Sequence, residues 1–506
     1  MTPIQSAPRR ASYISIMSLI HPVSARVLLA FVLCLLIGAT RADGQVNARK
    51  ELPVVTKTTA IRNARIVQAP GRVLERGTIV MREGRIVAVG RNVDIPYDAE
   101  IIDGDSLTVY AGFIDGLSYA GMPEVKEPER DARVNPAEPP NDVAGIQPER
   151  LARTVLLPDE PSIEKLRKIG FTAAHVVPRG GILPGTGSIV LLTGEDARSM
   201  VLRPDVSLYF TFEGGRGVYP NTPMGIMATM RQFAREAERR GRVEELYAAN
   251  STDIGRPIYD PVHEAFYPVI SGERPIVALA DGTDSALEAR RALQLREELG
   301  FRLILAGVDQ GFEIVDKLEG VPFFLTLGLP KIPKEDEASD STATGEAPTE
   351  AGEMSEARAR DFVRDHRTRS YQDVDEERNN LEARRSLQRE RYVATASTLN
   401  KAGLRFGFTS LGVDVKDVRK NLREMITAGF PEDAALAALT IDAARLLDID
   451  DVTGTIEAGK IGNLVVTRGS YFDPEAPVRY VFIEGRKFEI DSDEQKKKSD
   501  ETAERL

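Results

Sequence analysis

Residues 285–307, SALEARRALQLREELGFRLILAG, decide the fold class. Ala289, Ala292 and Leu293 recur at the spacing of one face of an amphipathic helix, so this helix packs on something. Gly300 follows as a residue that commonly ends a helix in the left-handed conformation. The next residues are apolar on both faces, which is typical of a buried parallel strand. The stretch predicts a helix that packs against the strand following it.

The same order of helix, glycine and apolar strand recurs along the middle of the chain. Alternating units of this kind indicate an α/β protein, and several in succession favour a (β/α)₈ barrel of the TIM type. A doubly wound open sheet is the alternative. The further units are 162–177, 312–328 and 394–410, which turn at Gly170, Gly320 and Gly403.

Both ends of the chain read as β structure instead. GTIVMREGRIVAVG (77–90) and VRYVFIEGRKFEI (478–490) each place two β-branched or aromatic runs around a Glu-Gly pair, which is typical of a hairpin. Because chain ends often lie close together, we expect residues 50–112 and 449–490 to build one small composite β-sandwich. The barrel then spans residues 113–448.

An insertion of residues 334–392 interrupts the barrel. Its first part, 334–356, has no aromatic or β-branched aliphatic residue, and we expect a disordered loop. Its second part, 357–392, is highly charged and is expected to form a solvated helix. A charged tail covers 491–506.

The N-terminal 42 residues have the pattern of a secretory signal peptide. Residues 27–37, VLLAFVLCLLI, follow Arg26, and the small residues before Asp43 suit cleavage. This apolar run is shorter than the roughly 20 residues that span a bilayer. We therefore expect cleavage near Ala42 and an exported protein, periplasmic or extracellular, without a stable membrane anchor. An uncleaved anchor is the alternative.

Cleavage would change the net charge and the residue content of the chain. The chain carries a formal charge of −11, and residues 1–42 contain arginines but no acid, so the mature chain would be still more acidic. Such a chain is a poor candidate for binding nucleic acid. Cleavage would also remove the single cysteine, Cys34, and leave only His175, His263 and His366.

The stretch AGFIDGLSYAG (111–121) ends a predicted strand at the start of the barrel. Residues i and i+2 of a strand face the same way, so two histidines one residue apart can both bind a metal at such a strand end. Here those places hold Leu117 and Tyr119. Leu117 cannot coordinate a metal, and Tyr119 is a poor zinc ligand.

These parts together resemble the amidohydrolase superfamily, and within it the secreted, imidazolonepropionase-like branch. ALTIDAARLLDIDDVTGTIEAGKIGNLVV (438–466) is similar to that family's C-terminal signature, with Asn463 where the family has aspartate. The resemblance implies a (β/α)₈ barrel beside a composite β-sandwich. It also implies a hydrolase that acts on C–N bonds other than peptide bonds and uses zinc.

The family's metal ligands do not carry over to this chain. The positions that the resemblance assigns to them hold Leu117, Tyr119, Ala278, Ala306 and Leu411. We therefore expect no metal and no other cofactor.

Six residues remain as candidates for a pocket, and each has a structural alternative. His175 could act as a general base at the barrel mouth, or it could be a packed structural histidine. Asp281 and Asp309 could bind a cation or a basic ligand, or cap the following helices. Asp115 could simply hold the strand-end loop, and the glycine-rich stretch 179–194 is expected to form a tight loop over the mouth. The six candidates are Asp115, Tyr119, His175, Asp281, Asp309 and Ser410.

Two functional classes stay open from the sequence. One is a hydrolase of the amidohydrolase type whose metal site is lost or rebuilt. The other is a non-catalytic relative that binds a small molecule or acts as a partner subunit, either with an active amidohydrolase paralogue or with a second copy of itself.

Overall fold

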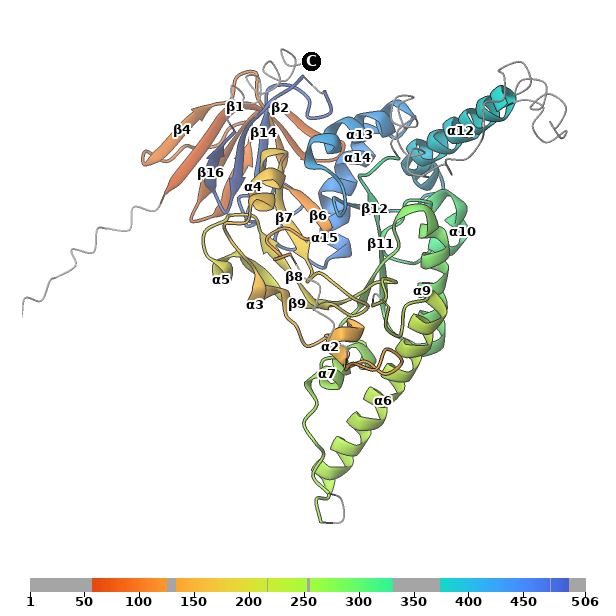
Figure 1. Ribbon diagram of the computed structural model, residues 1–506. Helices are drawn as coiled ribbons and strands as arrows, with labels where there is room; N and C mark the ends of the chain where they lie inside the picture. The colour runs from red at the N-terminus through yellow and green to blue at the C-terminus, as the bar shows by residue number, and fades with distance from the viewer. Residues whose placement is uncertain are drawn as a thin grey trace, which may run out of the picture. The chain divides into compact units, whose positions relative to one another are not determined.

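The computed structural model describes residues 57–490 except 125–132, 216, 253–254, 331–373 and 474 (Figure 1). All of these residues belong to the unit Lys57–Leu506. The expected signal peptide, the expected loop at 334–356, His366 and the charged tail lie outside the described residues. Within the described ranges, no helix has the length and apolar character needed to cross a membrane.

A β-rich domain is built from both ends of the chain, as predicted. Its hydrogen bonds run through one eight-stranded sheet in the order β16-β15-β14-β5-β1-β2-β3, with β4 paired to β1. The two ends of the chain meet where β5 pairs antiparallel with β14. The strands are β1 (Thr58–Ala69), β2 (Arg72–Arg82), β3 (Arg85–Gly90), β4 (Ala99–Asp103), β5 (Thr108–Ala111), β14 (Leu464–Thr467), β15 (Val478–Ile483) and β16 (Arg486–Glu489).

The two Glu-Gly pairs make the predicted hairpins. Glu83 and Gly84 have φ values of 50° and 76°, and Glu484 and Gly485 have 50° and 69°. Positive φ at both central residues is the type I′ geometry, whose twist matches that of the flanking strands. Gly462 donates its N–H to the oxygen of Gly84 at 2.7 Å, so the two hairpin turns lie on the same side of the domain.

The C-terminal signature residues hold their own loop and join the two halves of the β domain. Lys460 donates to the carbonyl oxygens of Asp450 (2.7 Å) and Thr453 (3.2 Å). The Glu457 carboxylate lies 2.6 Å from the Arg72 guanidinium, and the Ile456 N–H donates to the Gln68 oxygen at 2.9 Å. These contacts show that the signature has a structural role in this chain.

The second sheet forms the predicted barrel, with eight strands in the order β13-β12-β11-β10-β9-β8-β7-β6. Seven of them run in one direction, as in a (β/α)₈ barrel. The strands are β6 (Phe113–Ser118), β7 (Phe171–Val176), β8 (Gly185–Leu191), β9 (Val201–Phe210), β10 (Ile276–Leu279), β11 (Leu303–Gly307), β12 (Phe323–Thr326) and β13 (Gly407–Thr409).

One strand departs from the regular pattern. β8 pairs antiparallel with both β7 and β9. The glycine-rich stretch 179–194, expected to be a loop, contains this strand, and that expectation was wrong. Its glycines remove side chains where the strand is buried: a Cβ at Gly187 would lie 2.6 Å from the His175 ring. The close packing of the His175 ring against the strand, rather than a tight turn, explains the glycine at position 187.

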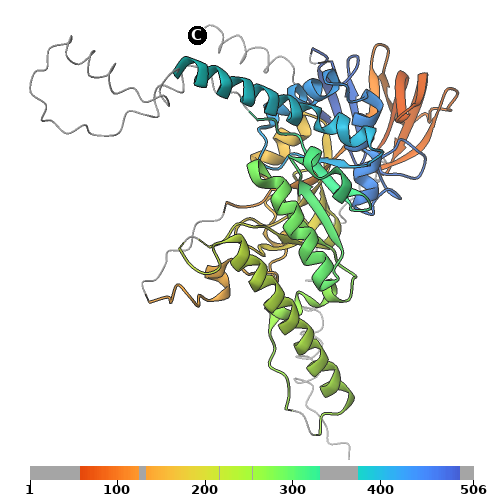
Figure 2. The same cartoon turned by 90° about the vertical axis from the view of Figure 1, so that its right-hand side faces the viewer.

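The helices surround and connect the barrel strands (Figures 1 and 2). The expected helix at the start of 312–328 is replaced by two short turns, η2 and α10. The helix α12 extends past residue 392, the predicted end of the charged helix. The helices are α2 (Asn141–Ala144), α3 (Ala152–Val155), α4 (Pro161–Lys168), α5 (Ala197–Met200), α6 (Pro223–Ala249), α7 (Pro261–Glu264), α8 (Tyr267–Ile270), η1 (Gly282–Asp284), α9 (Ser285–Leu299), η2 (Gly311–Glu313), α10 (Val315–Leu318), α12 (Val374–Lys401), α13 (Val415–Thr427), α14 (Glu432–Leu439) and α15 (Ile441–Leu446).

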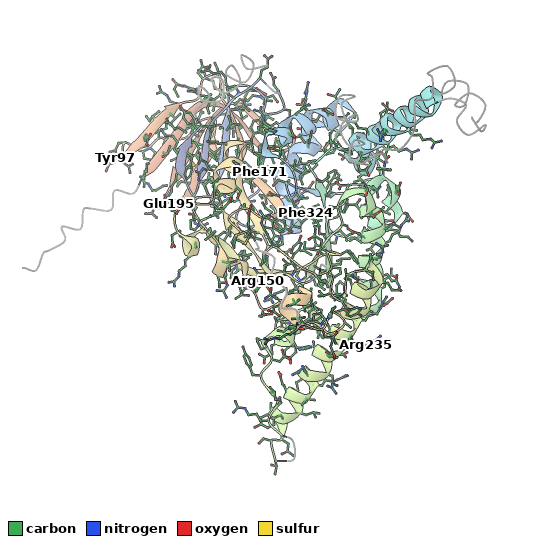
Figure 3. The ribbon with its side chains drawn as sticks, in the orientation of Figure 1. Tyr97, Arg150, Phe171, Glu195, Arg235 and Phe324 are labelled. Atoms are coloured by element: carbon green, nitrogen blue, oxygen red, sulfur yellow. The ribbon has the colours of Figure 1, made fainter. Side chains whose placement is uncertain are left out.

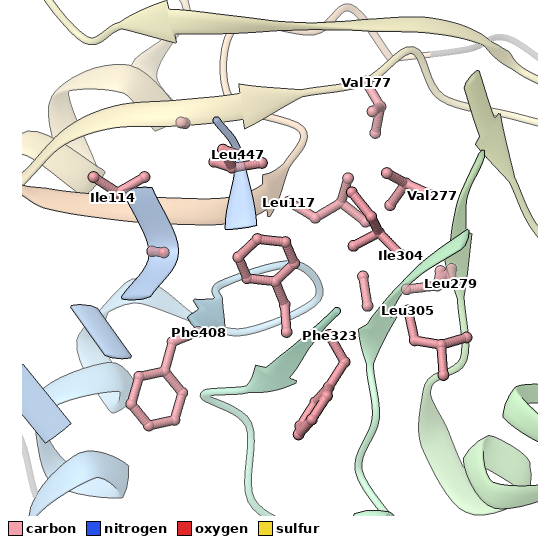
Figure 4. Packing of buried hydrophobic residues seen from close by; sticks show 14 of the residues in the cluster. Ile114, Leu117, Val177, Val277, Leu279, Ile304, Leu305, Phe323, Phe408 and Leu447 are labelled. Carbon is pink, nitrogen blue, oxygen red and sulfur yellow. The ribbon is translucent and has the colours of Figure 1, made fainter. Parts of the chain in front are cut away.

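A continuous apolar core fills the barrel (Figures 3 and 4). Phe324 is fully buried, and a Cβ at Gly116 would lie 2.0 Å from its ring. A Cβ at Gly407 would meet the same ring at 2.6 Å. The two glycines on β6 and β13 thus make the space that this phenylalanine occupies where the barrel closes.

Candidate functional site

The carboxyl ends of the parallel strands define the mouth of the barrel, where enzymes of this fold carry their active sites. Tyr119 follows β6 and Thr211 follows β9 at this end. Asp281 and Asp309 lie two residues after β10 and β11. The sequence-predicted candidates Tyr119, Asp281 and Asp309 are therefore at the mouth.

A pair of tyrosines crosses the mouth from β6 to β9. The hydroxyls of Tyr119 and Tyr209 are 2.8 Å apart, and their rings meet edge to face. The Arg179 guanidinium stacks 4.4 Å from the centre of the Tyr119 ring, and its Nε is buried without a hydrogen-bond partner in the described structure. A cation over an aromatic face is a favourable contact. The unpaired Nε is a donor that a bound acceptor could satisfy.

Burial dominates the chemistry of this tyrosine pair. It raises the pKa of Tyr119, and the negative charges of Glu213 and Asp281 raise it further, whereas the Tyr209 hydroxyl and Arg179 lower it. The pKa of Tyr209, which is fully buried, is raised well above its ordinary value. Both phenols are neutral at pH 7 and can donate or accept hydrogen bonds.

Three carboxyl groups interact electrostatically near the mouth: Asp281 raises the pKa of both Asp309 and Glu288, and also that of Tyr119. The pKa of Asp309 is raised to about 7. Burial is the main cause and the nearby Asp281 adds to it, whereas the hydrogen bond that Asp309 Oδ2 accepts from the Gly282 N–H at 2.5 Å lowers the pKa. Burial also raises the pKa of Glu288 to about 7. The pKa of Asp281 is raised by its own burial. With a pKa of about 7, Asp309 and Glu288 carry a proton in a substantial fraction of molecules near neutral pH, as the acid of an acid–base pair does.

The capping alternative does not account for these aspartates. Asp281 precedes η1 and Asp284 precedes α9, yet neither makes a side-chain capping hydrogen bond to the turn or helix that follows it. Asp309 accepts from Gly282, which belongs to the loop after the neighbouring strand. Its carboxyl therefore joins two adjacent loops at the mouth.

Asp115 and Ser410 lie together, but they are part of the barrel wall. Asp115 is fully buried and accepts hydrogen bonds from the Ser410 N–H (2.9 Å) and from the Ser410 hydroxyl. Burial raises the pKa of Asp115 to about 6, and these hydrogen bonds partly offset that effect. The pair joins β6 to the residue after β13, which agrees with the structural alternative for Asp115.

His175 lies apart from the mouth cluster. Its ring is fully buried between the Gly116 oxygen, 3.2 Å from Nδ1, and the Ser207 hydroxyl, 2.7 Å from Nε2. Burial lowers the pKa of His175 to about 4, which makes it a weak base at neutral pH. These contacts agree with the packed structural histidine.

The positions that the resemblance assigns to metal ligands are mostly apolar and buried. Leu117, Ala278 and Ala306 are fully buried, and Leu411 is half-buried. Figure 4 shows Leu117 directed toward Ile304 among the core side chains. Ala278 pairs with Phe210 and Leu305, whereas Val277 pairs with Tyr209 and Ile304. Ala278 is therefore on the sheet face opposite to Tyr209.

Sequence reasoning missed two mouth residues, Tyr209 and Arg179. Tyr209 lies in β9, a strand that the sequence analysis did not predict. Arg179 precedes β8, which was expected to be a loop. The apolar run IVLL (189–192) was the local signal of that strand. The contacts of both residues with Tyr119 depend on how the strands are ordered around the barrel.

One family model matches about a quarter of the chain. Residues 363–488 match the family model described as the amidohydrolase family. No curated protein matches the chain.

Solved structures also resemble this chain. An amidohydrolase from Thermotoga maritima MSB8 is 20% identical, with a TM-score of 0.63, over 85% of this chain and 100% of its own. This similarity establishes the fold. A prolidase in complex with N-methylphosphonate-L-proline is 17% identical, with a TM-score of 0.45, over 86% of this chain and 100% of its own. A putative prolidase from Bifidobacterium longum has the same identity and TM-score and covers 95% of its own chain.

Zinc is the metal that the resemblance to amidohydrolases implies, and the residues of this chain can be compared with the ligands that zinc uses. Zinc sites use His, Cys and carboxylate ligands, three of them in a catalytic site. Among the described residues, no group of three or more His, Cys, Asp or Glu side chains is arranged to hold a metal ion. His263 stacks on Phe233 and pairs with Asp260, away from both His175 and the mouth strands. The described residues do not fit the family's zinc site.

Proposed function

We propose that this amidohydrolase is a non-catalytic member of its family that binds a small molecule at the barrel mouth. The observation that carries the proposal is the environment of Leu117. Its side chain is fully buried in the apolar core at the strand end where a metal-binding histidine is expected. Placing a divalent ion in such surroundings without compensating ligands would be strongly unfavourable.

The mouth has groups suited to binding. The Tyr119 and Tyr209 hydroxyls, the buried Arg179 Nε and the Asp309 carboxyl offer both donors and acceptors. A few polar groups in an otherwise apolar setting commonly set the orientation of a ligand. A zinc-activated water, which the family's hydrolysis requires, has no evident substitute among them.

The test is the metal content and activity of the purified protein. We expect less than one tightly bound zinc per chain after dialysis. We also expect no hydrolysis of amide, lactam or dipeptide substrates above background, with or without added zinc. Stoichiometric zinc together with chelator-sensitive turnover would refute the proposal and identify a working metallohydrolase.

A second candidate is a hydrolase with a rebuilt, carboxylate-based site. The observation that favours it is the pairing of Asp281 with Asp309, because the latter titrates near neutral pH. If metal-independent hydrolysis is found, Asp309→Asn and Asp281→Asn should abolish it, and Asp316→Asn, at an exposed position, should not. Turnover that survives both mouth substitutions would eliminate this candidate.

We further propose that the protein is exported and acts beside a partner. The N-terminal sequence pattern and the missing metal ligands motivate this hypothesis. The partner would be an active amidohydrolase paralogue or a second copy of the chain. Light scattering of the purified protein, and affinity capture from the native host, test it: a monomer that captures no amidohydrolase would contradict the partner role.

A further inference from the structure

One exposed face of the helix α6 carries arginines around a surface hollow of about 490 Å³. We infer that this basic groove holds the acidic segment 334–356 of the same chain. Among the described residues, only side chains of α6 line the groove, and no mouth residue does, so the inference does not depend on the function proposed for the mouth. The lining residues are Ala228, Arg231, Gln232, Arg235, Glu236 and Arg239.

The spacing of these residues places them on one side of the helix. Positions 228, 232, 235 and 239 recur every three or four residues, so their side chains follow one another along a single face. The opposite face is buried through Met230, Phe233 and Ala237. The basic groove is therefore on the side of α6 that faces away from the core.

The carboxylates beside the groove are already engaged by other groups. Glu298, on α9, lies 2.5 Å from Arg231 Nε. Glu236 accepts a hydrogen bond from Gln232 at 3.0 Å, and its other oxygen lies 3.4 Å from the His263 ring. Neither carboxylate is left to neutralise a second arginine.

Two guanidinium groups therefore remain in the groove. Within the part of the chain that the structure describes, Arg235 and Arg239 form no hydrogen bond or ion pair, and Arg235 only helps to lower the pKa of Glu298 by a longer-range attraction. Both are exposed and one helical turn apart. Guanidinium groups bind carboxylates through two parallel hydrogen bonds, so a carboxylate-rich segment is the ligand that fits.

The segment 334–356, KEDEASDSTATGEAPTEAGEMSE, supplies such carboxylates. It contains eight acidic residues and one lysine. The whole chain carries a formal charge of −11, so a foreign polyanion meets repulsion from the rest of the protein. An exposed ion pair contributes only about 0.2–1 kcal/mol, but a tether gives an effective concentration in the millimolar range. The tether favours the chain's own segment over a foreign polyanion.

The chain that leads to the segment is long enough to reach the groove. It leaves the described structure at Pro330, after β12, which pairs with β11. From the loop after β11, where Gln310 accepts from the Ala286 N–H, α9 runs to Glu298 beside Arg231. The 15 residues of α9 span about 22 Å. The roughly 15 residues between Pro330 and the middle of the segment can extend about 50 Å.

Disulfide trapping tests the inference on the full mature chain, which contains no cysteine once residues 1–42 are removed. Ser341→Cys, in the acidic segment, is combined with Ala228→Cys in the groove. The control combines Ser341→Cys with Leu287→Cys, which is 47% exposed at the start of α9 and closer to Pro330. We expect the intramolecular disulfide to form roughly 3- to 10-fold faster at residue 228 than at residue 287, the value of one or two exposed ion pairs.

Substitutions and salt show whether the arginines cause this difference. Arg235→Gln with Arg239→Gln should remove it, and so should about 0.5 M NaCl, which screens exposed charges. Arg76→Gln with Arg256→Gln, at two exposed positions outside the groove, should leave it unchanged. Equal rates at residues 228 and 287, or a difference that survives the groove substitutions, would overturn the inference. Disulfide-linked dimers as the main product would assign the groove to a second copy and also overturn it.

A competition experiment keeps both groove arginines and so does not depend on how the variants fold. A synthetic peptide of residues 334–356, at several millimolar, should slow trapping at residue 228. A peptide with every Asp and Glu replaced by Asn and Gln should not. If both peptides slow the trapping, or if neither does, the groove does not recognise the acidic segment.

Discussion

Asp115 and Ser410 are 295 residues apart in sequence, and the carboxyl group of the first accepts two hydrogen bonds from the second. Asp115 lies in β6, the first barrel strand, and Ser410 directly follows β13, the last. Close by, the Thr409 hydroxyl donates to the Leu117 oxygen at 2.6 Å. These contacts join the two end strands of the barrel sheet.

The hydrogen bonds between Asp115 and Ser410 should contribute measurably to stability. Ser410→Ala removes the hydroxyl donor from a buried carboxyl group, so we expect the free energy of unfolding to fall by about 1–3 kcal/mol. Ser251→Ala, at an exposed position, should change it by less than about 0.5 kcal/mol. Denaturant unfolding measures both variants; equal effects would show that the Asp115–Ser410 contact adds nothing.

Stability should depend on the protonation of His175. Burial lowers the pKa of His175 to about 4, whereas an unfolded chain has a histidine pKa of about 6.5. The unfolded state therefore binds more protons between these values, and stability from this group is complete above pH 6.5 and lost as the pH falls to 4. The loss is about 3 kcal/mol by linkage.

His175→Gln keeps an amide donor and an acceptor in place of the ring and cannot titrate. We expect its free energy of unfolding to vary less between pH 4 and 6.5 than that of the wild type, as measured by denaturant unfolding at each pH. Parallel pH profiles for the two proteins would contradict the assigned shift.

Asp309 should have the opposite effect on the pH profile. Burial raises the pKa of Asp309 to about 7, so the folded state holds a proton that the unfolded state releases above pH 4. Stability from this group is present below pH 4 and lost as the pH rises to 7, by at most about 4 kcal/mol. Asp309→Asn should therefore be more stable relative to the wild type at pH 8 than at pH 5.

Urea unfolding at both pH values measures this difference. Asp316→Asn is the matched control, because the Asp316 side chain is 75% exposed. A relative stability of Asp309→Asn that is the same at pH 5 and pH 8 would show that Asp309 titrates normally.

Placing histidines at positions 117 and 119 should not create a zinc site. Leu117→His with Tyr119→His places imidazoles at two strand-end positions, but Ala306 and Leu411 still supply no ligands. Leu117→His also puts a polar ring in the apolar core, which should cost about 2–5 kcal/mol. Leu117→Met, which conserves volume, should cost less than about 1.5 kcal/mol. Elemental analysis and unfolding test this; one zinc per double variant would contradict it.

The mature protein should begin near Asp43. The apolar run at 27–37 and the small residues that follow it motivate this prediction. N-terminal sequencing of the protein from its native host is the measurement, and recovery of soluble protein with residues 1–42 intact would refute it.

Local patterns in the sequence determined the building blocks. The helix–glycine–strand unit at 285–307 forms α9, a left-handed Gly300 with φ of 77°, and β11. The Glu-Gly pairs form type I′ hairpins because the turn geometry depends on two adjacent residues. Both outcomes rest on interactions within a few residues, which a sequence displays directly.

Tertiary structure alone decided which side chains meet. The contact of Tyr119 with Tyr209, and the reversed direction of β8, depend on strand order and register around the barrel. The face that Ala278 presents is set in the same way, because a shift of one residue moves a side chain to the other face of a sheet. Long-range pairing sets that register, and no stretch of a single strand records it.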